Sequence, residues 1–231
     1  MCTRFVYNGN DMITGFNFEI DLSVWKHKVI KEKDCFYIGI LRPDGKFHSY
    51  HGVNKNGNVG TLLYVHGNTE GEYKYGSDYM TISDLTEKFI QAKLSFDDVL
   101  QILKTKKITY AHDATMQTML SDISGRVLII EPGIGYKKEK NKYSLITNYS
   151  LIKPKSTKKF IVPGDDRYEC ALKILEQCKN NFSISDAFSL LKKVHQEGIW
   201  STRVSFVYSA NEQAVYYTEN NQFEQIKKFE F

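Results

Sequence analysis

The stretch MCTRFVYNGNDMITGFNFEI (residues 1–20) decides the fold of this chain. Two runs rich in aromatic and aliphatic residues flank the turn NGND (8–11), and Asn-Gly between such runs is a strong signal for a β-hairpin. The pattern therefore predicts two antiparallel strands. Cys2 stands at the start of the first of these strands.

Cys2 directly follows the initiator methionine. Aminopeptidases usually remove a methionine that precedes a small residue, and Cys2 would then carry a thiol and a free α-amine. An α-amine has a pKa of about 7.7–8.0 and a free thiol one of about 8.5, so the amine can accept the thiol proton. This single residue is a candidate nucleophile with its own base, although an arbitrary cysteine is the alternative at this position.

Composition is that of an ordinary globular protein. The 231 residues are 42% hydrophobic and 25% charged, which predicts one domain spanning 1–231 with a sizeable core. The net charge of +4 includes two dense basic stretches, KKEKNK (137–142) and KPKSTKK (153–159). Both are interpreted as solvated loops, because no aromatic residues alternate with the lysines as in many nucleic-acid surfaces.

The four cysteines show no C-x-x-C pair and no metal-ligand spacing with histidine. We therefore expect reduced thiols, a cytoplasmic protein, and neither a metal nor an organic cofactor. The N-terminus has no basic segment followed by an apolar run, and no segment approaches the length of a membrane span. A signal peptide and a membrane partner are accordingly not expected.

The rest of the chain alternates between strand and helix patterns. Residues 36–54 predict a second hairpin around Pro-Asp-Gly (43–45). Apolar residues at helical spacing predict helices over 81–92 and 95–105, then a second helix pair over 167–180 and 184–198 that Gly198 would cap. Strands are expected between the pairs and at the C-terminus, where SANEQ (209–213) joins two of them. Two batches of antiparallel strands and two helix pairs favour stacked α+β layers.

Five segments in order resemble the choloylglycine hydrolase family of N-terminal nucleophile (Ntn) hydrolases. They are MCTRFVY (1–7), TGFNFE (14–19), NKNGNVGTLLYVHG (54–67), SLITNYS (144–150) and VPGDDRYE (162–169), with WSTRVSFVYSANEQAVYYTENN (200–221) similar to the closing strands. The resemblance implies a four-layer αββα sandwich of two antiparallel sheets between helix layers. It also implies hydrolysis of a linear amide C–N bond of an acylated small molecule through a thioester, as in penicillin V acylases or bile salt hydrolases. An acyltransferase or an inactive acyl-ligand-binding homologue is the alternative.

The resemblance assigns the nucleophile to Cys2 and the carboxylate that holds its amine to Glu19. Asp21 remains a second candidate, because strand alternation places it on the same face as Glu19. The family pattern has an arginine where this chain has Phe16, so one cation is missing. Arg4 is close in sequence to Cys2 and lies on the neighbouring strand, and its substitution for the missing cation is left open.

Three further positions match the family's catalytic motifs. Tyr64 matches the residue beside the oxyanion hole, with a buried core aromatic as the alternative, and the Asn148 carboxamide is a donor for the oxyanion. Arg167 matches the family's second arginine, at a helix start where the helix dipole does not favour a cation. His66 and His112 are weaker candidates for a pocket wall. The short segment 149–162 gives no reason to assume a tetramer, and a homo-oligomer remains possible.

Overall fold

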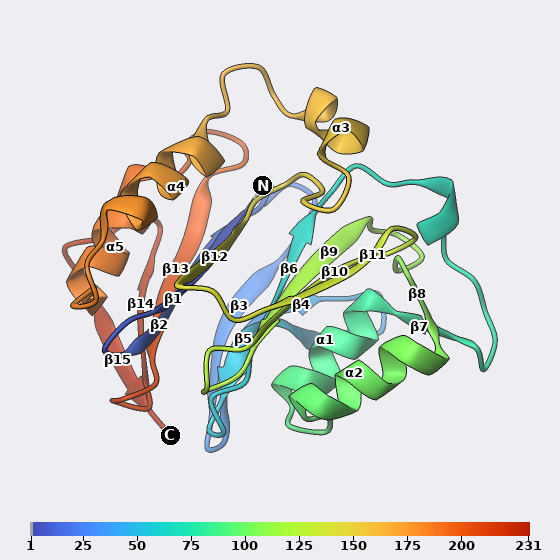
Figure 1. The fold of residues 1–231 in the computed structure, drawn as a ribbon, viewed down its shortest axis with the longest axis horizontal. Coiled ribbons are helices and arrows are strands. Elements are labelled where there is room, and N and C mark those ends of the chain that lie inside the picture. The colour runs from blue at the N-terminus through green and yellow to red at the C-terminus, as the bar shows by residue number, and fades with distance from the viewer. Residues whose placement is uncertain (1) are drawn as a thin grey trace.

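The computed structural model describes residues 2–231, and its central feature is a pair of antiparallel sheets packed face to face (Figure 1). The first sheet has the order β12 (Tyr143–Ile146), β1 (Thr3–Asn8), β2 (Met12–Glu19), β13 (Thr202–Ser209), β14 (Ala214–Glu219), β15 (Lys227–Glu230). The second has the order β11 (Gly135–Glu139), β10 (Val127–Glu131), β9 (Met116–Ser121), β6 (Val59–Tyr64), β5 (Phe47–Asn54), β4 (Cys35–Leu41), β3 (His27–Glu32).

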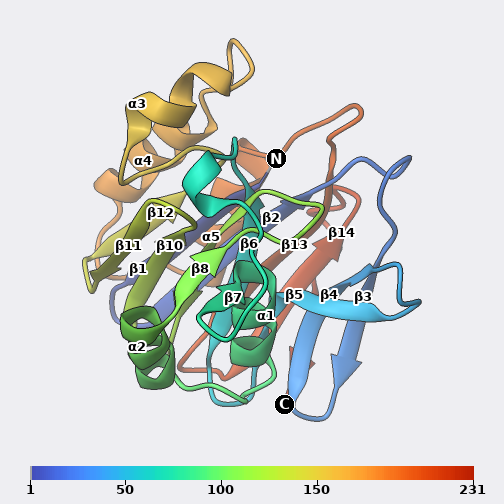
Figure 2. The same ribbon diagram turned by 90° about the vertical axis from the view of Figure 1, so that its right-hand side faces the viewer.

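Helices cover the outer face of each sheet. The helices α4 (Arg167–Gln177) and α5 (Ile184–Lys193) lie on the first sheet, and α1 (Ile82–Ile90) and α2 (Phe96–Thr105) lie on the second (Figures 1 and 2). This arrangement confirms the predicted αββα sandwich. Shorter elements connect the layers: η1 (Thr69–Gly71), the parallel pair β7 (Tyr79–Thr81) and β8 (Lys107–Thr109), α3 (Pro154–Thr157) and η2 (Lys158–Phe160).

Three apolar clusters hold the layers together. The central core lies between the sheets and includes Phe16, Phe36 and Phe206, all fully buried. A second cluster joins the first sheet to α4 and α5, and a third joins the second sheet to α1 and α2. Because β2 has the central core on one face and α5 on the other, every residue of the strand is buried. Glu19, at its end, is therefore drawn into the protein interior.

Most of the element predictions agree with the structure. The NGND turn joins β1 to β2 with Asn8 paired to Met12, and Ser95 and Ser183 cap α2 and α5 through capping boxes. The predicted C-cap at Gly198 is wrong, since α5 ends at Lys193 with Val194 as its cap. Gly198 has φ +77° and begins a separate turn that Ser201 closes, so its left-handed backbone belongs to the loop before β13.

Neither a membrane-spanning helix nor a metal-ligand cluster occurs in the part of the chain that is described. No helix within residues 2–231 combines the length and the apolar character that a bilayer crossing needs. Within the same range, no group of three His, Cys, Asp or Glu side chains gathers in an arrangement suited to a metal ion.

Gly52 in β5 lies too close to the backbone of β4 to accept a side chain. A Cβ atom at this position in β5 would lie 2.4 Å from the carbonyl oxygen of Phe36 and 2.9 Å from the Cα of Tyr37, and backbone atoms cannot move aside cheaply. We expect Gly52→Ala to lower the free energy of unfolding by about 1–3 kcal/mol in urea titrations. The control, Lys28→Ala at an exposed position of β3, should change it by less than about 0.5 kcal/mol. Equal stability of the two variants would contradict the prediction.

Candidate active site

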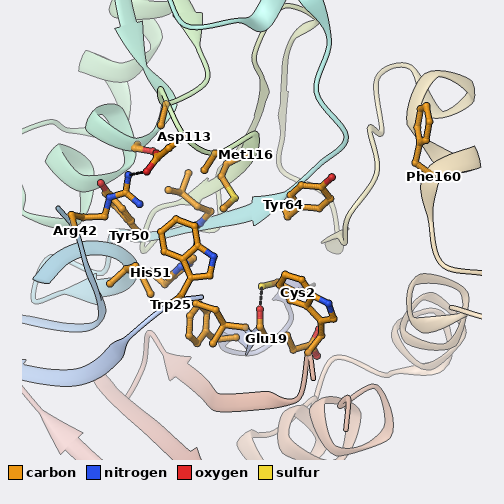
Figure 3. Close-up of a pocket in the computed structure, with 18 of the residues that line it drawn as sticks. Cys2, Glu19, Trp25, Arg42, Tyr50, His51, Tyr64, Asp113, Met116 and Phe160 are labelled. Atoms are coloured by element: carbon orange, nitrogen blue, oxygen red, sulfur yellow. Dashed lines mark hydrogen bonds and ion pairs between the residues drawn. The ribbon is translucent and has the colours of Figure 1, made fainter. Parts of the chain in front are cut away.

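Cys2 lies immediately before β1, beside the end of β2. The register pairs Thr3 with Asn17, so its continuation places Cys2 opposite Phe18 and one position away from Glu19. Cys2 is 4% exposed, and its Sγ lies 3.8 Å from the main-chain oxygen of Glu19 (Figure 3). Its main-chain nitrogen donates a 2.7 Å hydrogen bond to Oδ1 of Asn148.

Asn148 follows β12, which pairs with β1 on the side opposite to β2. Its side chain bridges the two sheets, because Oδ1 contacts Cys2 in the first sheet while Nδ2 donates to the main-chain oxygen of Tyr64 at 2.8 Å in the second. Oδ1 also accepts a bond of 3.1 Å from Nη2 of Arg167. Asn148 thus fixes the position of the Cys2 nitrogen relative to both sheets.

Arg167 is the first residue of α4, and its guanidinium is buried between two carboxylates. Nη1 lies 2.7 Å from Oε2 of Glu19, and Nε and Nη2 lie 2.8 and 2.7 Å from the two oxygens of Asp165. The second oxygen of Glu19 accepts a 2.9 Å bond from the hydroxyl of Thr202. The side chains of Glu19 and Arg167 are 0% and 6% exposed, so this pair is withdrawn from water.

Burial governs the protonation equilibria of this cluster. It raises the pKa of the Glu19 carboxyl to about 8, against the opposing effect of Arg167. The pKa of Asp165 stays below its ordinary value despite its burial, because Arg167 binds both of its oxygens. Burial, and to a smaller extent the charge of Glu19, also raises the pKa of the Cys2 thiol. The thiol is therefore protonated at neutral pH and needs a base before it can act as a nucleophile.

The main chain of Tyr64 faces Asn148. In an antiparallel strand, residues two apart point their N–H groups to the same side. The N–H of Leu62 points away from β9 toward β5, where it donates to His51, so the N–H of Tyr64 at the end of β6 points the same way. The carbonyl of Tyr64 accepts from Asn148 on this side. The Tyr64 side chain is 48% exposed, which excludes a core aromatic.

The structure separates Asp21 from the cluster. Asp21 lies beyond the end of β2, and its carboxylate accepts bonds from the main-chain nitrogen and the hydroxyl of Ser23 at 2.8 and 2.7 Å. It therefore stabilises a surface turn, whereas Glu19 contacts the buried Arg167. Geometry thus favours Glu19 over Asp21 beside Cys2.

Phe16 and Arg4 both lie inside the sandwich. Phe16 belongs to the central core and stacks on His51 with ring centroids 5.2 Å apart. Arg4 pairs with Phe16 across the strands, but its guanidinium binds the main-chain oxygen of Phe5 and, at 3.0 Å, the hydroxyl of Ser121. Arg4 does not line the cavity at Cys2, so it does not supply the cation that the resemblance implied there.

Cys2 and Glu19 open onto a cavity of about 380 Å³ between the sheets (Figure 3). Its wall is mainly apolar, with Phe18, Ile20, Trp25, Ile40, Leu62 and Met116 among the lining residues. Arg42 also lines it, in an ion pair with Asp113 and with its guanidinium 5.2 Å from the Trp25 ring. His66 and His112 are not lining residues, whereas His51, which was not singled out from the sequence, is one. Only the paired strands reveal His51, because its spacing to Cys2 in the chain carries no signal.

Known structures share this architecture. The chain superposes on penicillin V acylase from Agrobacterium tumefaciens with a TM-score of 0.65 and 17% identity, covering 94% of this chain and 83% of that one. It also superposes on a variant of conjugated bile acid hydrolase from Clostridium perfringens with a TM-score of 0.70 and 13% identity, covering 100% and 92%. The chain has the Ntn-hydrolase fold.

A more distant likeness covers the Caenorhabditis elegans orthologue of N-acylethanolamine-hydrolyzing acid amidase, with a TM-score of 0.51, 16% identity, and coverage of 90% of this chain and 93% of that one. No protein-family model matches the sequence, and no curated protein matches it either. At these identities the likeness establishes the Ntn fold alone.

The buried guanidinium of Arg167 should contribute strongly to the stability of the fold. Removal of Arg167 leaves the Glu19 and Asp165 carboxyls buried without a cation, so we expect the free energy of unfolding to fall by about 3–5 kcal/mol at neutral pH. Lys158→Ala breaks an exposed ion pair with Glu169 and should cost less than about 1 kcal/mol.

The deficit of Arg167→Leu should also depend on pH. Arg167 holds the pKa of Asp165 below its ordinary value of about 3.9, so this contribution is present above that pH and is lost as the pH falls through the native pKa. Urea titrations of both variants at a series of pH values measure the difference. A deficit that is equal to that of Lys158→Ala, or that grows on acidification, would contradict the assignment.

Proposed function

We propose that the protein is an N-terminal cysteine hydrolase that cleaves the linear amide C–N bond of an acylated small molecule. One observation carries the proposal: Cys2 lies at an apolar cavity, with its nitrogen and sulfur held by Asn148 and Glu19, and Arg167 joins these two partners. The activity requires the removal of Met1, which lies outside the described residues. The Ntn fold of the chain is consistent with this chemistry.

The charges around Cys2 support a mature α-amine. Arg167 supplies one positive charge for two buried carboxylates, Asp165 and Glu19. With both carboxylates ionised, the cluster has an excess negative charge in a low-dielectric environment, and burial accordingly raises the pKa of Glu19. An α-ammonium on Cys2 would neutralise this charge and favour ionised Glu19. We therefore assign Glu19 the role of orienting the amine.

The reaction uses the amine as a proton carrier. It accepts the proton from Sγ of Cys2, and the thiolate attacks the carbonyl carbon of the substrate. When the tetrahedral intermediate collapses, the C–N bond breaks and the leaving amine takes that proton. Water, deprotonated by the same α-amine, then attacks the thioester. The C–S bond breaks, the acid leaves and the thiol is restored.

Two donors fit the developing oxyanion. The main-chain N–H of Tyr64 points to the side on which the carboxamide of Asn148 lies. Nδ2 of Asn148 has two hydrogens, and the bond to the Tyr64 carbonyl uses one of them. Preorganised donors of this kind typically contribute about 2.7–4 kcal/mol to transition-state stabilisation. Arg167 acts as a positioning residue, because its three partners occupy the guanidinium.

The substrate class follows from the cavity. A volume of about 380 Å³ with a mainly apolar lining fits the acyl part of a small molecule, and the candidates are bile salts, phenoxyacetyl penicillins, acyl homoserine lactones and fatty-acyl amides. Phe16 favours a second candidate, an Ntn homologue that binds acyl amides without cleaving them. It places an aromatic ring where the family pattern has a cation, and the thiolate loses that stabilisation.

The test combines mass spectrometry with substitution of Cys2. We expect purified protein to lack Met1 and to release the acid from at least one of the four amide classes. Cys2→Ala and Cys2→Ser should reduce turnover to background, whereas Cys35→Ala, at a buried thiol outside the cavity at Cys2, should not. Release of acid by both Cys2 variants at the wild-type rate would refute the hydrolase. Binding of an acyl amide to processed protein without release of acid would favour the second candidate.

A further inference from the structure

His51 of β5 is a buried histidine on the wall of the cavity that contains Cys2 (Figure 3). It is 5% exposed, and its ring centroid lies 5.2 Å from that of Phe16 and 4.8 Å from that of Phe18. The imidazole is therefore held in a fixed orientation by aromatic packing. The reaction steps proposed for Cys2 do not use it.

A bulge in β5 places this ring in the cavity wall. Ile38 pairs with His51 and Gly39 with Ser49, so Tyr50 is an extra residue in the ladder between β4 and β5. A bulge of this kind changes the direction of neighbouring side chains, and the adjacent Tyr50 and His51 both line the cavity. The ladder between β5 and β6 stops at the pair of His51 with Thr61.

A hydrogen bond at the end of the ladder between β5 and β6 determines the tautomer of the His51 ring. The main-chain N–H of Leu62 donates to Nδ1 of His51 at 3.2 Å, so the ring takes the place of a main-chain acceptor. Burial lowers the pKa of His51 to about 3, which keeps the ring neutral at physiological pH. A neutral imidazole that accepts on Nδ1 carries its proton on Nε2.

The Nε2–H group is a donor without an acceptor among residues 2–231. No hydrogen bond from it occurs in this range, and Nε2 is also absent from the fully buried, unpartnered side-chain atoms of these residues. His51 lines the cavity and its Nε2 atom is not fully buried, so this donor is open to the cavity. The wall of this cavity is mainly apolar, with Phe18, Ile40 and Leu62 among the lining residues. A hydrocarbon in the cavity would leave this donor unpaired, which is costly in an apolar environment.

We propose that His51 selects the acyl group by donating a hydrogen bond from Nε2 to an oxygen acceptor within it. The favoured substrates are amides whose acyl chain contains an ether, keto or hydroxyl oxygen, in preference to pure hydrocarbon chains. This inference rests on the proposed function. It adds a polar requirement to a mainly apolar cavity, and it assigns that requirement to the His51 side chain.

The experiment moves one oxygen along the acyl chain. The probes are p-nitroanilides of a straight saturated acyl chain and their analogues in which one methylene is replaced by an ether oxygen, at each position in turn. We expect wild-type kcat/KM to favour the ether over its hydrocarbon analogue by about threefold to tenfold at one position. His51→Phe should abolish the preference, and His51→Gln, which retains an N–H donor, should keep part of it.

A neighbouring hydroxyl provides the matched control. Tyr50→Phe removes a polar group from the same cavity and should leave the ether preference unchanged. The measured quantity is the ratio of kcat/KM for an ether probe to kcat/KM for its hydrocarbon analogue, taken within each variant. A loss of stability or of overall rate lowers both values and leaves this ratio unchanged. An ether preference that persists in His51→Phe, or that disappears in Tyr50→Phe, would overturn the assignment.

Binding measurements on a variant without the thiol test the role of His51 independently of amide hydrolysis. The dissociation constants of the same probes are also measured on Cys2→Ala protein, which retains His51 and the cavity but not the thiol. Tighter binding of one ether analogue, dependent on His51, supports the inference even if no acid is released. Equal binding and equal turnover of all probes would refute it, and Cys2-dependent release of acid would then leave the hydrolase intact.

Discussion

The arrangement of the candidate site depends on one buried guanidinium. Arg167 binds both oxygens of Asp165 and one oxygen of Glu19, and it reaches Asn148, the partner of the Cys2 nitrogen. These contacts join the end of β2, the segment after β12 and the start of α4. A buried cation is stable only when its partners satisfy both its charge and its donors, so the positions of these segments are interdependent. The same interdependence gives Cys2 a defined orientation.

Cys2 lies between a polar cluster and a mainly apolar cavity. The polar cluster is Glu19, Asn148 and Arg167, and it supports the proposed roles in proton transfer and oxyanion binding. Phe18 and His51 line the cavity, and Phe16 packs against His51 from the central core. Phe16 stands where the resemblance implied an arginine, and its aromatic ring packs against the imidazole of His51.

The likeness to structures with 13–17% identity has a physical basis. An αββα sandwich requires strands with two buried faces in the middle, amphipathic helices outside and tight turns between neighbouring strands. Many sequences meet these requirements, so little identity survives while the fold does. The arrangement of Cys2, Glu19, Asn148 and Arg167 depends on specific polar contacts, and it therefore carries more of the argument for function than the fold does.

The sequence by itself determined the local elements and the identity of the polar residues beside Cys2. The Asn-Gly turn and the capping Ser95 act within a few residues, so the first hairpin and the start of α2 follow from local patterns. Glu19, Asn148 and Arg167 were found through resemblance to a known family, not through local rules. The Gly198 prediction failed because a glycine after a helix marks a left-handed residue without fixing which turn uses it.

Only the tertiary structure decided which of these residues meet, and which others join them. The choice of Glu19 over Asp21 and the exposure of Tyr64 depend on where β2 and β6 end. The interior position of Arg4 depends on the pairing of β1 with β2 and on its contact with Ser121 in the other sheet. His51 enters the cavity wall because a bulge in β5 interrupts its ladder with β6. Strand register and burial are set by contacts between residues far apart in the chain, so no local pattern around His51 could have revealed them.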